Sequence, residues 1–274
     1  MISIDDFRKD HPFPQAEGIK SLFKFFRFNE DHPEYLSCLF EEANLYHSLP
    51  KDLNDPFECS PHFLYPNTGE DAAKLRKHLI KVGKESGLRK KDAEKMVSIN
   101  MRNTEGLKVA LNDSIKRVFN EVRVCCFTQN VDNLLFWSHY ADSHKGLCVK
   151  FDSQKLPISA SQKVKYQNEY PTVDFPQPKD TRAFRPLLTK SNVWKYEEEY
   201  RSLLYPRASV RLPKNDTSYI LSNNVLKAVY FGANMDARHI EKVRTMIANG
   251  PFSPELWKVE LESAAYGIKF ARIT

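Results

Sequence analysis

The stretch Ser21-Leu22-Phe23-Lys24-Phe25-Phe26-Arg27-Phe28 gives the clearest strand signal in the chain. It is rich in aromatic residues with polar residues between them, a pattern that is typical of β-strands. Short apolar runs predict further strands at residues 44–48, 121–127, 147–151, 164–166, 225–232, 256–261 and 268–270. The alternating run 147–151 predicts a strand with one face in contact with water. A sheet is therefore expected at the centre of the fold.

Helical patterns separate these strands. Residues 34–42 suit a short helix, and residues 236–249 have the apolar spacing of an amphipathic helix. Residues 69–119 are charged and helical with interruptions at glycines, which predicts an insertion of two or three helices. The sequence thus predicts an α+β fold, with a central, mostly antiparallel sheet and a helical insertion at about 69–119. We expect a single domain over residues 1–274.

Composition indicates a protein of the cytoplasm without membrane contact. Among 274 residues there are 18 Phe, 12 Tyr and 3 Trp, enough apolar surface to offset the entropy of the chain. No run approaches the roughly 20 apolar residues of a membrane span, and residues 1–7 do not resemble a signal peptide. The five cysteines have no C-x-x-C spacing, so neither a disulfide framework nor a metal site is predicted. Cys125 and Cys126 are expected to be core residues rather than catalytic thiols.

The charge balance permits anionic partners without requiring them. Lys and Arg total 41 against 35 Asp and Glu, which gives a net charge of +6. Much of this excess falls in residues 74–95, where apolar residues are interleaved with Lys and Arg. A solvated helix face is the favoured interpretation of this run, and a nucleic-acid-binding stripe is the alternative.

The densest group of polar and aromatic residues is Asp132-Asn133-Leu134-Leu135-Phe136-Trp137-Ser138-His139-Tyr140-Ala141-Asp142-Ser143-His144-Lys145-Gly146. We expect a helix here that begins at an Asn130 or Asp132 cap and runs to about Asp142. On such a helix Trp137, Tyr140 and His144 share a face, and neither a metal-binding histidine pair nor a Ser-His pair is formed. These rings suit the stacking of a planar ligand. Anchoring of the helix to the sheet explains them equally well.

Two shorter segments also carry polar side chains. In the loop at 50–58, Asn54 and Asp55 are expected to build a fixed turn, which either presents groups to a ligand or is purely structural. If residues 194–201 form a strand, Glu197, Glu199 and Arg201 share one face and can form a polar network. In that network Arg201 would hold one carboxylate ionised. The alternative is a solvent-facing strand edge whose salt bridges contribute little.

These motifs resemble an uncharacterised bacterial family, the domain of unknown function DUF2971. The resemblance is carried, in order, by Leu22–Phe25, Asn54–Glu58, Cys126–Thr128, Asp132-Asn133, Trp137–Asp142, His144–Gly146, Trp194–Glu197 and Glu199–Arg201. It extends from about Leu22 to the closing strands. Phe136 stands where the family often has Met, and Thr128 where Ser is common.

The order of these elements is also similar to that of ADP-ribosyltransferases, with a basic first strand and a later Glu-x-Glu step. That resemblance implies that Lys24 or Arg27 binds the phosphates of NAD and that Tyr140 or Trp137 stacks on nicotinamide. Glu199 would stabilise the cationic ribosyl transition state, and Glu197 would orient the nucleophile. The Ser-Thr-Ser element of those enzymes is not evident in this sequence.

Three functional hypotheses follow. The first is an NAD-binding ADP-ribosyltransferase-like enzyme or glycohydrolase, with NAD as candidate substrate. The second is a non-catalytic ligand-binding or regulatory module in bacterial defence or stress response. The third is a nucleic-acid enzyme that uses Asp132, His139 and Lys145, so both a nucleotide and nucleic acid stay open as partners. The candidate catalytic residues are Glu199, Glu197 and His139, and the candidate ligand-binding residues are Lys24, Arg27, Asn54, Asp55, Asp132, Asn133, Trp137, Ser138, Tyr140, His144, Lys145, Tyr196 and Arg201.

Overall fold

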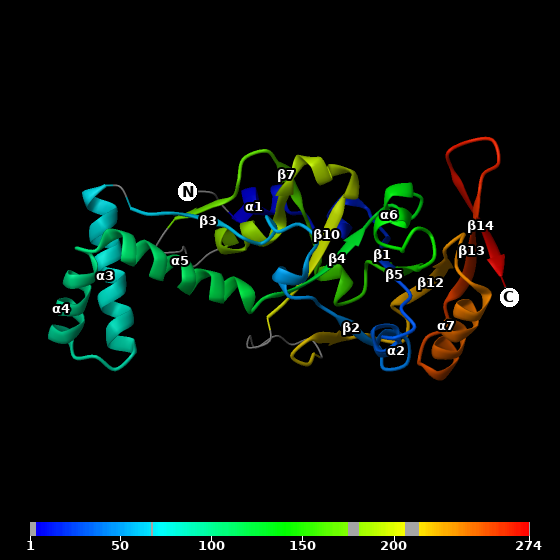
Figure 1. The fold of residues 1–274 in the computed structure, drawn as a ribbon, viewed down its shortest axis with the longest axis horizontal. Coiled ribbons are helices and arrows are strands. Elements are labelled where there is room, and N and C mark those ends of the chain that lie inside the picture. The colour runs from blue at the N-terminus through cyan, green and yellow to red at the C-terminus, as the bar shows by residue number, and fades with distance from the viewer. Residues whose placement is uncertain (1–3, 67, 175–180, 206–213, 274) are drawn as a thin grey trace.

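An eight-stranded sheet forms the centre of the computed structural model, which describes residues 4–66, 68–174, 181–205 and 214–273 (Figure 1). Its strand order is β14-β13-β12-β5-β1-β4-β10-β6, and all neighbours are antiparallel except the parallel pair β12 and β13. The prediction of an α+β fold with a mostly antiparallel sheet is confirmed. The strands are β1 (Ser21–Phe26), β4 (Arg123–Thr128), β5 (Leu147–Asp152), β6 (Gln162–Lys163), β10 (Glu199–Leu204), β12 (Leu226–Phe231), β13 (Glu255–Leu261) and β14 (Ile268–Ile273).

Three two-stranded sheets are added to this centre. They pair β2 (Asn44–Tyr46) with β11 (Ser218–Ile220), β3 (His62–Leu64) with β8 (Thr172–Asp174), and β7 (Lys165–Gln167) with β9 (Thr189–Ser191). Short 3-10 helices connect several elements, at Pro14–Glu17, Pro50–Asp52, Ile158–Ala160, Thr181–Leu188 and Asn192–Glu197. The first α-helix, α1 (Ile4–Asp10), had no counterpart in the sequence prediction.

Helices cover both faces of the sheet. On one face α2 (Glu34–Phe40) and α7 (Ala237–Asn249) join the largest apolar core, and on the other α6 (Leu134–His139) joins a second core. Strand β5 contributes Leu147 and Val149 to the first core and Cys148 to the second. The prediction of a water-facing side for this strand is therefore wrong, because elements cover it on both sides.

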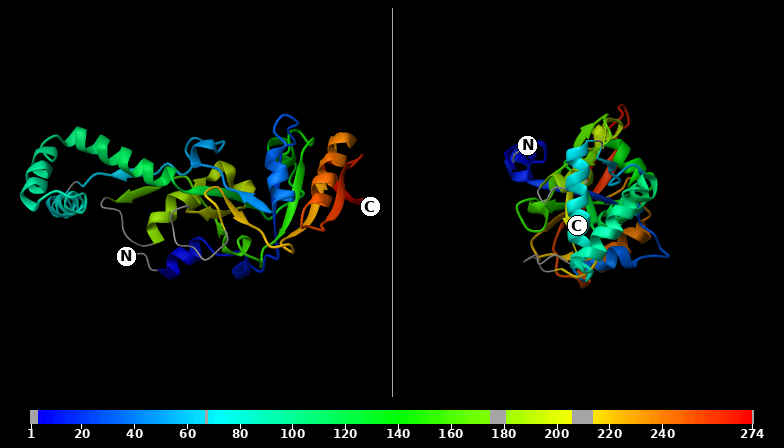
Figure 2. Two further views of the ribbon diagram at one scale, coloured as in Figure 1. Left: turned by 90° about the horizontal axis from the view of Figure 1, so that it is seen from below. Right: turned by 90° about the vertical axis from the view of Figure 1, so that its left-hand side faces the viewer.

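The helical insertion extends from one end of the sheet as three helices, α3 (Gly69–Glu85), α4 (Lys90–Asn100) and α5 (Thr104–Asn120) (Figure 2). A small core of its own contains Leu75, Leu107 and Leu111. The basic run 74–95 lies on α3 and α4, where most of its Lys and Arg side chains are exposed. Within the described ranges, no helix combines the length and apolarity that crossing a membrane requires.

The two central strands β1 and β4 separate soon after they meet. Their register holds one pair, Phe23 with Thr128, although each strand has six residues. Past this pair, Ser48 takes the place of β1 beside β4: its N–H donates to the Val124 carbonyl, and its carbonyl accepts from the Val124 N–H, at 2.9 and 2.8 Å. The sheet is thereby opened in its middle while the backbone groups of Val124 remain hydrogen-bonded.

His47 links the segment that enters this opening to strand β10. Its ring is fully buried, with Nδ1 2.9 Å from the Leu45 carbonyl and Nε2 3.0 Å from Ser202 Oγ. Because a carbonyl only accepts, Nδ1 carries the proton and Nε2 accepts from the hydroxyl. Burial lowers the pKa of His47 to about 3 from its ordinary 6.5. The unfolded chain therefore binds one more proton between these values, and stability falls as pH falls through this window.

Replacing His47 by Gln is expected to reduce this pH dependence, because an amide keeps hydrogen-bonding groups but does not titrate. Urea unfolding at several values between about pH 4 and pH 6.5 measures it. One proton taken up on unfolding corresponds to about 1.4 kcal/mol per pH unit. The variant should be less stable than wild type near neutrality and should lose less stability toward acid. Equal pH slopes in the two proteins would contradict a buried, neutral His47.

Candidate functional site

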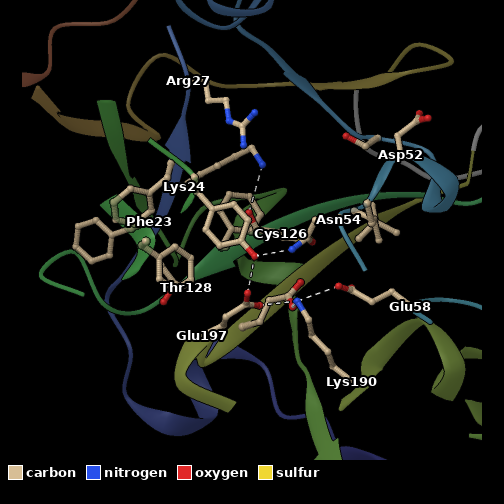
Figure 3. A pocket seen from close by; sticks show the side chains of 18 residues that line it. Phe23, Lys24, Arg27, Asp52, Asn54, Glu58, Cys126, Thr128, Lys190 and Glu197 are labelled. Atoms are coloured by element: carbon tan, nitrogen blue, oxygen red, sulfur yellow. Dashed lines mark hydrogen bonds and ion pairs between the residues drawn. The ribbon is translucent and has the colours of Figure 1, made fainter. Parts of the chain in front are cut away.

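A cavity of about 420 Å³ lies in the opening between β1 and β4 (Figure 3). The side chains of Phe23 and Phe25 from β1 and of Phe136 from α6 supply its aromatic part. Two cations of the first strand region, Lys24 and Arg27, line it as well. Glu58, Glu197, Glu199 and Lys190 line it too, and Figure 3 shows Glu58, Glu197 and Lys190 on the side opposite Lys24 and Arg27. These four residues and Arg201, which pairs with Glu58 and Glu199, are called the base of the cavity below.

Lys24 and Arg27 are held by backbone carbonyls rather than by carboxylates. Lys24 Nζ donates to the carbonyl of Cys126 at 3.4 Å, across the opening between the two strands. Arg27 Nη2 donates to the carbonyl of His139 at 3.2 Å, and the Arg27 side chain is exposed. A carbonyl does not neutralise the charge of either side chain. Burial opposes the charge of Lys24, but its neighbours, Glu199 among them, outweigh this and raise the pKa of Lys24.

Lys190 connects the three carboxylates at the base. Its Nζ lies 3.0 Å from Glu58 Oε1, 2.5 Å from Glu197 Oε2 and 3.2 Å from Glu199 Oε2. All four side chains are at most 4 % exposed. They come from three separate places in the chain: the loop after β2, strand β9, and the junction that leads into β10.

Arg201 contacts two glutamates of the base but does not line the cavity. Its Nε donates to Glu199 Oε1 at 2.7 Å, its Nη2 contacts Glu199 and Glu58, and its Nη1 donates to the Leu187 carbonyl at 2.8 Å. The side chain is fully buried. The polar network predicted for Glu197, Glu199 and Arg201 is thus present, but it is buried between β4 and β6 rather than at a solvent-facing edge.

The charges of this group do not cancel. Three carboxylates face two cations, so one negative charge remains when all are ionised. Burial raises the pKa of Glu197, and Glu199 adds to this although Lys190 opposes it. Burial also disfavours ionisation of Glu199, but Arg201 and Lys190 outweigh it and lower the pKa of Glu199. The pKa values of the two neighbouring carboxyls are therefore shifted in opposite directions: Glu199 stays ionised, whereas Glu197 binds a proton more readily than an ordinary glutamate.

Tyr140 joins the base to the wall of the cavity. Its hydroxyl donates to Glu197 Oε1 at 2.5 Å and accepts from Asn54 Nδ2 at 3.1 Å. Asn54 is placed by the turn around Asp55, whose Oδ1 accepts from the Phe57 N–H and whose Oδ2 accepts from Trp194 Nε1. Asp55 itself does not line this cavity, so its role in the structure is to hold the turn.

A bend in the backbone brings Glu197 and Glu199 to the same place. Residues 194–201 do not form the single strand considered in the sequence analysis. A 3-10 helix (Asn192–Glu197) is followed by Glu198 in a left-handed conformation (φ 44°), and β10 begins at Glu199. Glu198 points elsewhere and accepts hydrogen bonds from Gln129 and Asn130.

Trp137 and His144 lie outside the cavity, contrary to the prediction. Trp137 is fully buried, donates from Nε1 to the Val131 carbonyl and packs edge-on against Phe25. His144 stacks on Trp137 with ring centroids 6.1 Å apart. The predicted shared face of Trp137 and Tyr140 is wrong, because Tyr140 lies beside Phe136 instead, one residue past the end of α6.

Other predicted ligand-binding residues serve the structure. Asn133 caps α6 by accepting from the Leu135 N–H, and its Nδ2 donates to the Tyr196 carbonyl. Tyr196 packs near Trp194 and does not line the cavity. Arg201 pairs with Glu199 and Glu58 and does not line the cavity.

Four predicted residues are exposed and do not line the cavity. They are Asp132, Ser138, His139 and Lys145. The residues of the nucleic-acid-enzyme hypothesis, Asp132, His139 and Lys145, therefore lie apart from the lining of this cavity, and so does the catalytic candidate His139. Over the part of the chain that the structure describes, no group of three or more His, Cys, Asp or Glu is arranged to hold a metal ion.

Sequence reasoning missed several residues of the cavity. Glu58 belonged to a motif but was not selected, Asp52 was treated as loop, and Lys190 lies in no motif at all. A lysine next to an apolar run carries no signal of its own, because only the folded chain places it among carboxylates. Cys126 also lines the cavity, and burial raises the pKa of its thiol well above the ordinary value, which disfavours a nucleophilic role.

Replacing Arg201 by Met is expected to destabilise the protein by about 3–5 kcal/mol, because three buried carboxylates would then share Lys190 as their cation. Adding Glu199→Gln to this variant should restore part of the loss. The matched control is Lys242→Met, which removes an exposed pair with Glu30 (2.8 Å) and should have a much smaller effect on stability, because water screens exposed ion pairs. Urea unfolding measures all three, and similar losses for Arg201→Met and Lys242→Met would contradict the buried network.

Comparison with known protein families gives a match in the part of the chain from α6 to β10. Neither a curated protein nor a solved structure matches the chain. Residues 136–202 match the model of a family described as "Protein of unknown function (DUF2971)". This segment contains Tyr140, Lys190, Glu197, Glu199 and Arg201, which build much of the cavity and its base. The match confirms the resemblance to DUF2971 over residues 136–202.

Proposed function

We propose that the cavity binds a nucleotide and that its base promotes cleavage of an N-glycosidic bond, as in NAD glycohydrolases and ADP-ribosyltransferases. One observation carries the proposal. The base has one carboxylate more than it has cations, while Lys24 and Arg27 on the opposite side have no carboxylate partner among their hydrogen bonds. A ligand with phosphates at one end and a developing positive charge at the other fits this distribution.

The walls of the cavity suit the parts of NAD. Lys24 and Arg27 would bind phosphate oxygens, as the resemblance to ADP-ribosyltransferases implies. Of the two rings proposed for stacking, Tyr140 lines the cavity and Trp137 does not, so Tyr140, with Phe25 and Phe136 nearby, would contact nicotinamide. Asp52 also lines the cavity and offers a carboxylate to ribose hydroxyls.

The reaction would proceed by loss of nicotinamide. The bond between ribose C1′ and nicotinamide N1 breaks, and its electron pair leaves with nicotinamide, which becomes neutral. C1′ develops positive charge, which ionised Glu199 and the excess negative charge of the base stabilise. Water adds to C1′, and its proton passes to Glu197 and then to solvent, so the products are nicotinamide, ADP-ribose and one proton. An acceptor hydroxyl or amine in place of water gives ADP-ribosyl transfer.

The raised pKa of Glu197 suits the role of proton acceptor. Burial, with a further contribution from Glu199, raises the pKa of Glu197 and makes its carboxylate more basic than one in water. The fixed orientation of its two oxygens, one on Tyr140 and one on Lys190, would position it toward the nucleophile.

Glu199→Gln and Glu197→Gln are expected to lower the rate of nicotinamide release from NAD at least about 100-fold, because each removes a charge from the base at unchanged shape. The matched control is Glu198→Gln, since Glu198 lies between the two and faces Gln129 and Asn130. Its rate should stay within about twofold of wild type. Nicotinamide release is measured by chromatography at saturating NAD.

Two outcomes would contradict this assignment. If wild type binds NAD, as measured by calorimetry, but releases no nicotinamide, the cavity is a regulatory nucleotide site and not a catalytic one. If Glu198→Gln loses as much activity as Glu199→Gln, the effect arises from the local fold and not from the base.

Tyr140→Phe tests the protonation of Glu197. The hydrogen bond from Tyr140 favours the ionised carboxylate, so its loss should raise the pKa of Glu197 further. Because the proposed role requires ionised Glu197, activity falls as pH falls through this pKa. The acid limb of the pH–rate profile should therefore move to higher pH in Tyr140→Phe. The control is Tyr266→Phe, in which the limb should not move because Tyr266 is fully exposed. An unshifted limb in Tyr140→Phe would contradict the role of Glu197 as proton acceptor.

A further inference from the structure

A second cavity of about 500 Å³ adjoins the first. The two share part of their lining, so that the same side chains form the boundary between them. The shared residues are Lys24, Phe25, Arg27, Ser48, Asp52 and Tyr140. The cations of the site therefore lie between two compartments and not at the end of one.

The second compartment has the lining of a site for a planar ring. Tyr35, at the start of α2, and Tyr46, at the end of β2, are 58 % and 36 % exposed. Their ring centroids are 6.0 Å apart and their planes are inclined by 71°. Leu36 and Leu39 of α2 and Leu45 of β2, all buried core residues, form an apolar floor. Exposed aromatic rings above an apolar floor suit the stacking of a heterocycle.

Polar groups at this compartment provide hydrogen-bonding partners for such a ring. Asn44 and Asn29 line it, and although Asn44 Nδ2 donates to Glu42 and Asn29 Oδ1 accepts from the Asp31 N–H, each amide keeps a further donor and acceptor. Amides of this kind can pair with the donor and acceptor edge of a nucleobase. The polar groups of the two compartments differ, because none of the glutamates of the base lines the second.

We infer that the second compartment is a subsite for the second base of a dinucleotide, and that Lys24 and Arg27 bind the diphosphate that joins its two halves. This inference rests on the proposed function, because the first compartment is taken to hold the half whose glycosidic bond breaks. It places the second half of the substrate: a diphosphate-bridged dinucleotide occupies both compartments, whereas a mononucleotide such as nicotinamide mononucleotide fills only the first.

The contribution of the second compartment is measurable without turnover. Stacking of a base on an aromatic side chain commonly contributes about 1–3 kcal/mol, which corresponds to roughly 5- to 150-fold in affinity. The double variant Tyr35→Ala/Tyr46→Ala should therefore bind ADP-ribose at least about tenfold more weakly than wild type. Its affinity for nicotinamide mononucleotide should be unchanged, which also shows that the variant is folded.

Isothermal titration calorimetry with these two probes makes the test, with Tyr266→Ala as control because that tyrosine is fully exposed and lines neither cavity. The subsite is supported if the double variant, and not Tyr266→Ala, loses affinity for ADP-ribose while it keeps its affinity for nicotinamide mononucleotide. Equal affinity in wild type and double variant overturns it, as does an equal loss for both probes. Failure of ADP-ribose to bind wild type overturns it too.

The outcomes for the proposed function and for the subsite can be told apart. If the double variant loses affinity for ADP-ribose but wild type does not release nicotinamide from NAD, the dinucleotide subsite stands and the catalytic role does not. If wild type cleaves NAD and the two tyrosines have no effect on ADP-ribose binding, the catalytic role stands and the subsite does not.

Discussion

The separation of β1 from β4 is the constraint on which the site depends. Strands in the middle of a sheet normally pair along their length, because buried backbone groups must be hydrogen-bonded. Here Ser48 pairs with the N–H and carbonyl of Val124, and the side chain of Lys24 donates to the Cys126 carbonyl, so these groups of β4 have partners although the backbone of β1 does not pair with them. The sheet opens at its centre at little cost, and the opening is lined by β1, β4 and the loop that follows β2.

The buried charges at the base are costly unless each has a partner. Removing ions from water costs several kcal/mol per ion, and only close pairing and further hydrogen bonds offset this. Lys190 and Arg201 supply that pairing for Glu58, Glu197 and Glu199, and Tyr140 supplies a hydrogen bond to Glu197. A network of this kind is a weak source of stability. It is a good way to hold carboxylates in fixed positions beside a cavity.

The sequence predicted the elements better than it predicted the site. Aromatic and alternating runs located most strands, and Glu197, Glu199 and Arg201 were placed together from their spacing. The prediction that Trp137, Tyr140 and His144 share a helix face was wrong because α6 ends at His139. Asp142, Ser143 and His144 then adopt left-handed conformations that return the chain to Trp137. Lys190 could not be found at all, because only the folded chain brings the side chain of Lys190 in β9 to Glu199 at the start of β10.

A crystal structure of the protein with ADP-ribose tests the central claim most directly, because it locates the ligand independently of any activity. The account predicts the diphosphate within hydrogen-bonding distance of Lys24 and Arg27, and the distal ribose in the opening between β1 and β4, facing Glu197 and Glu199. Ligand bound elsewhere on the protein, or an opening that stays empty at saturating ADP-ribose, would contradict it.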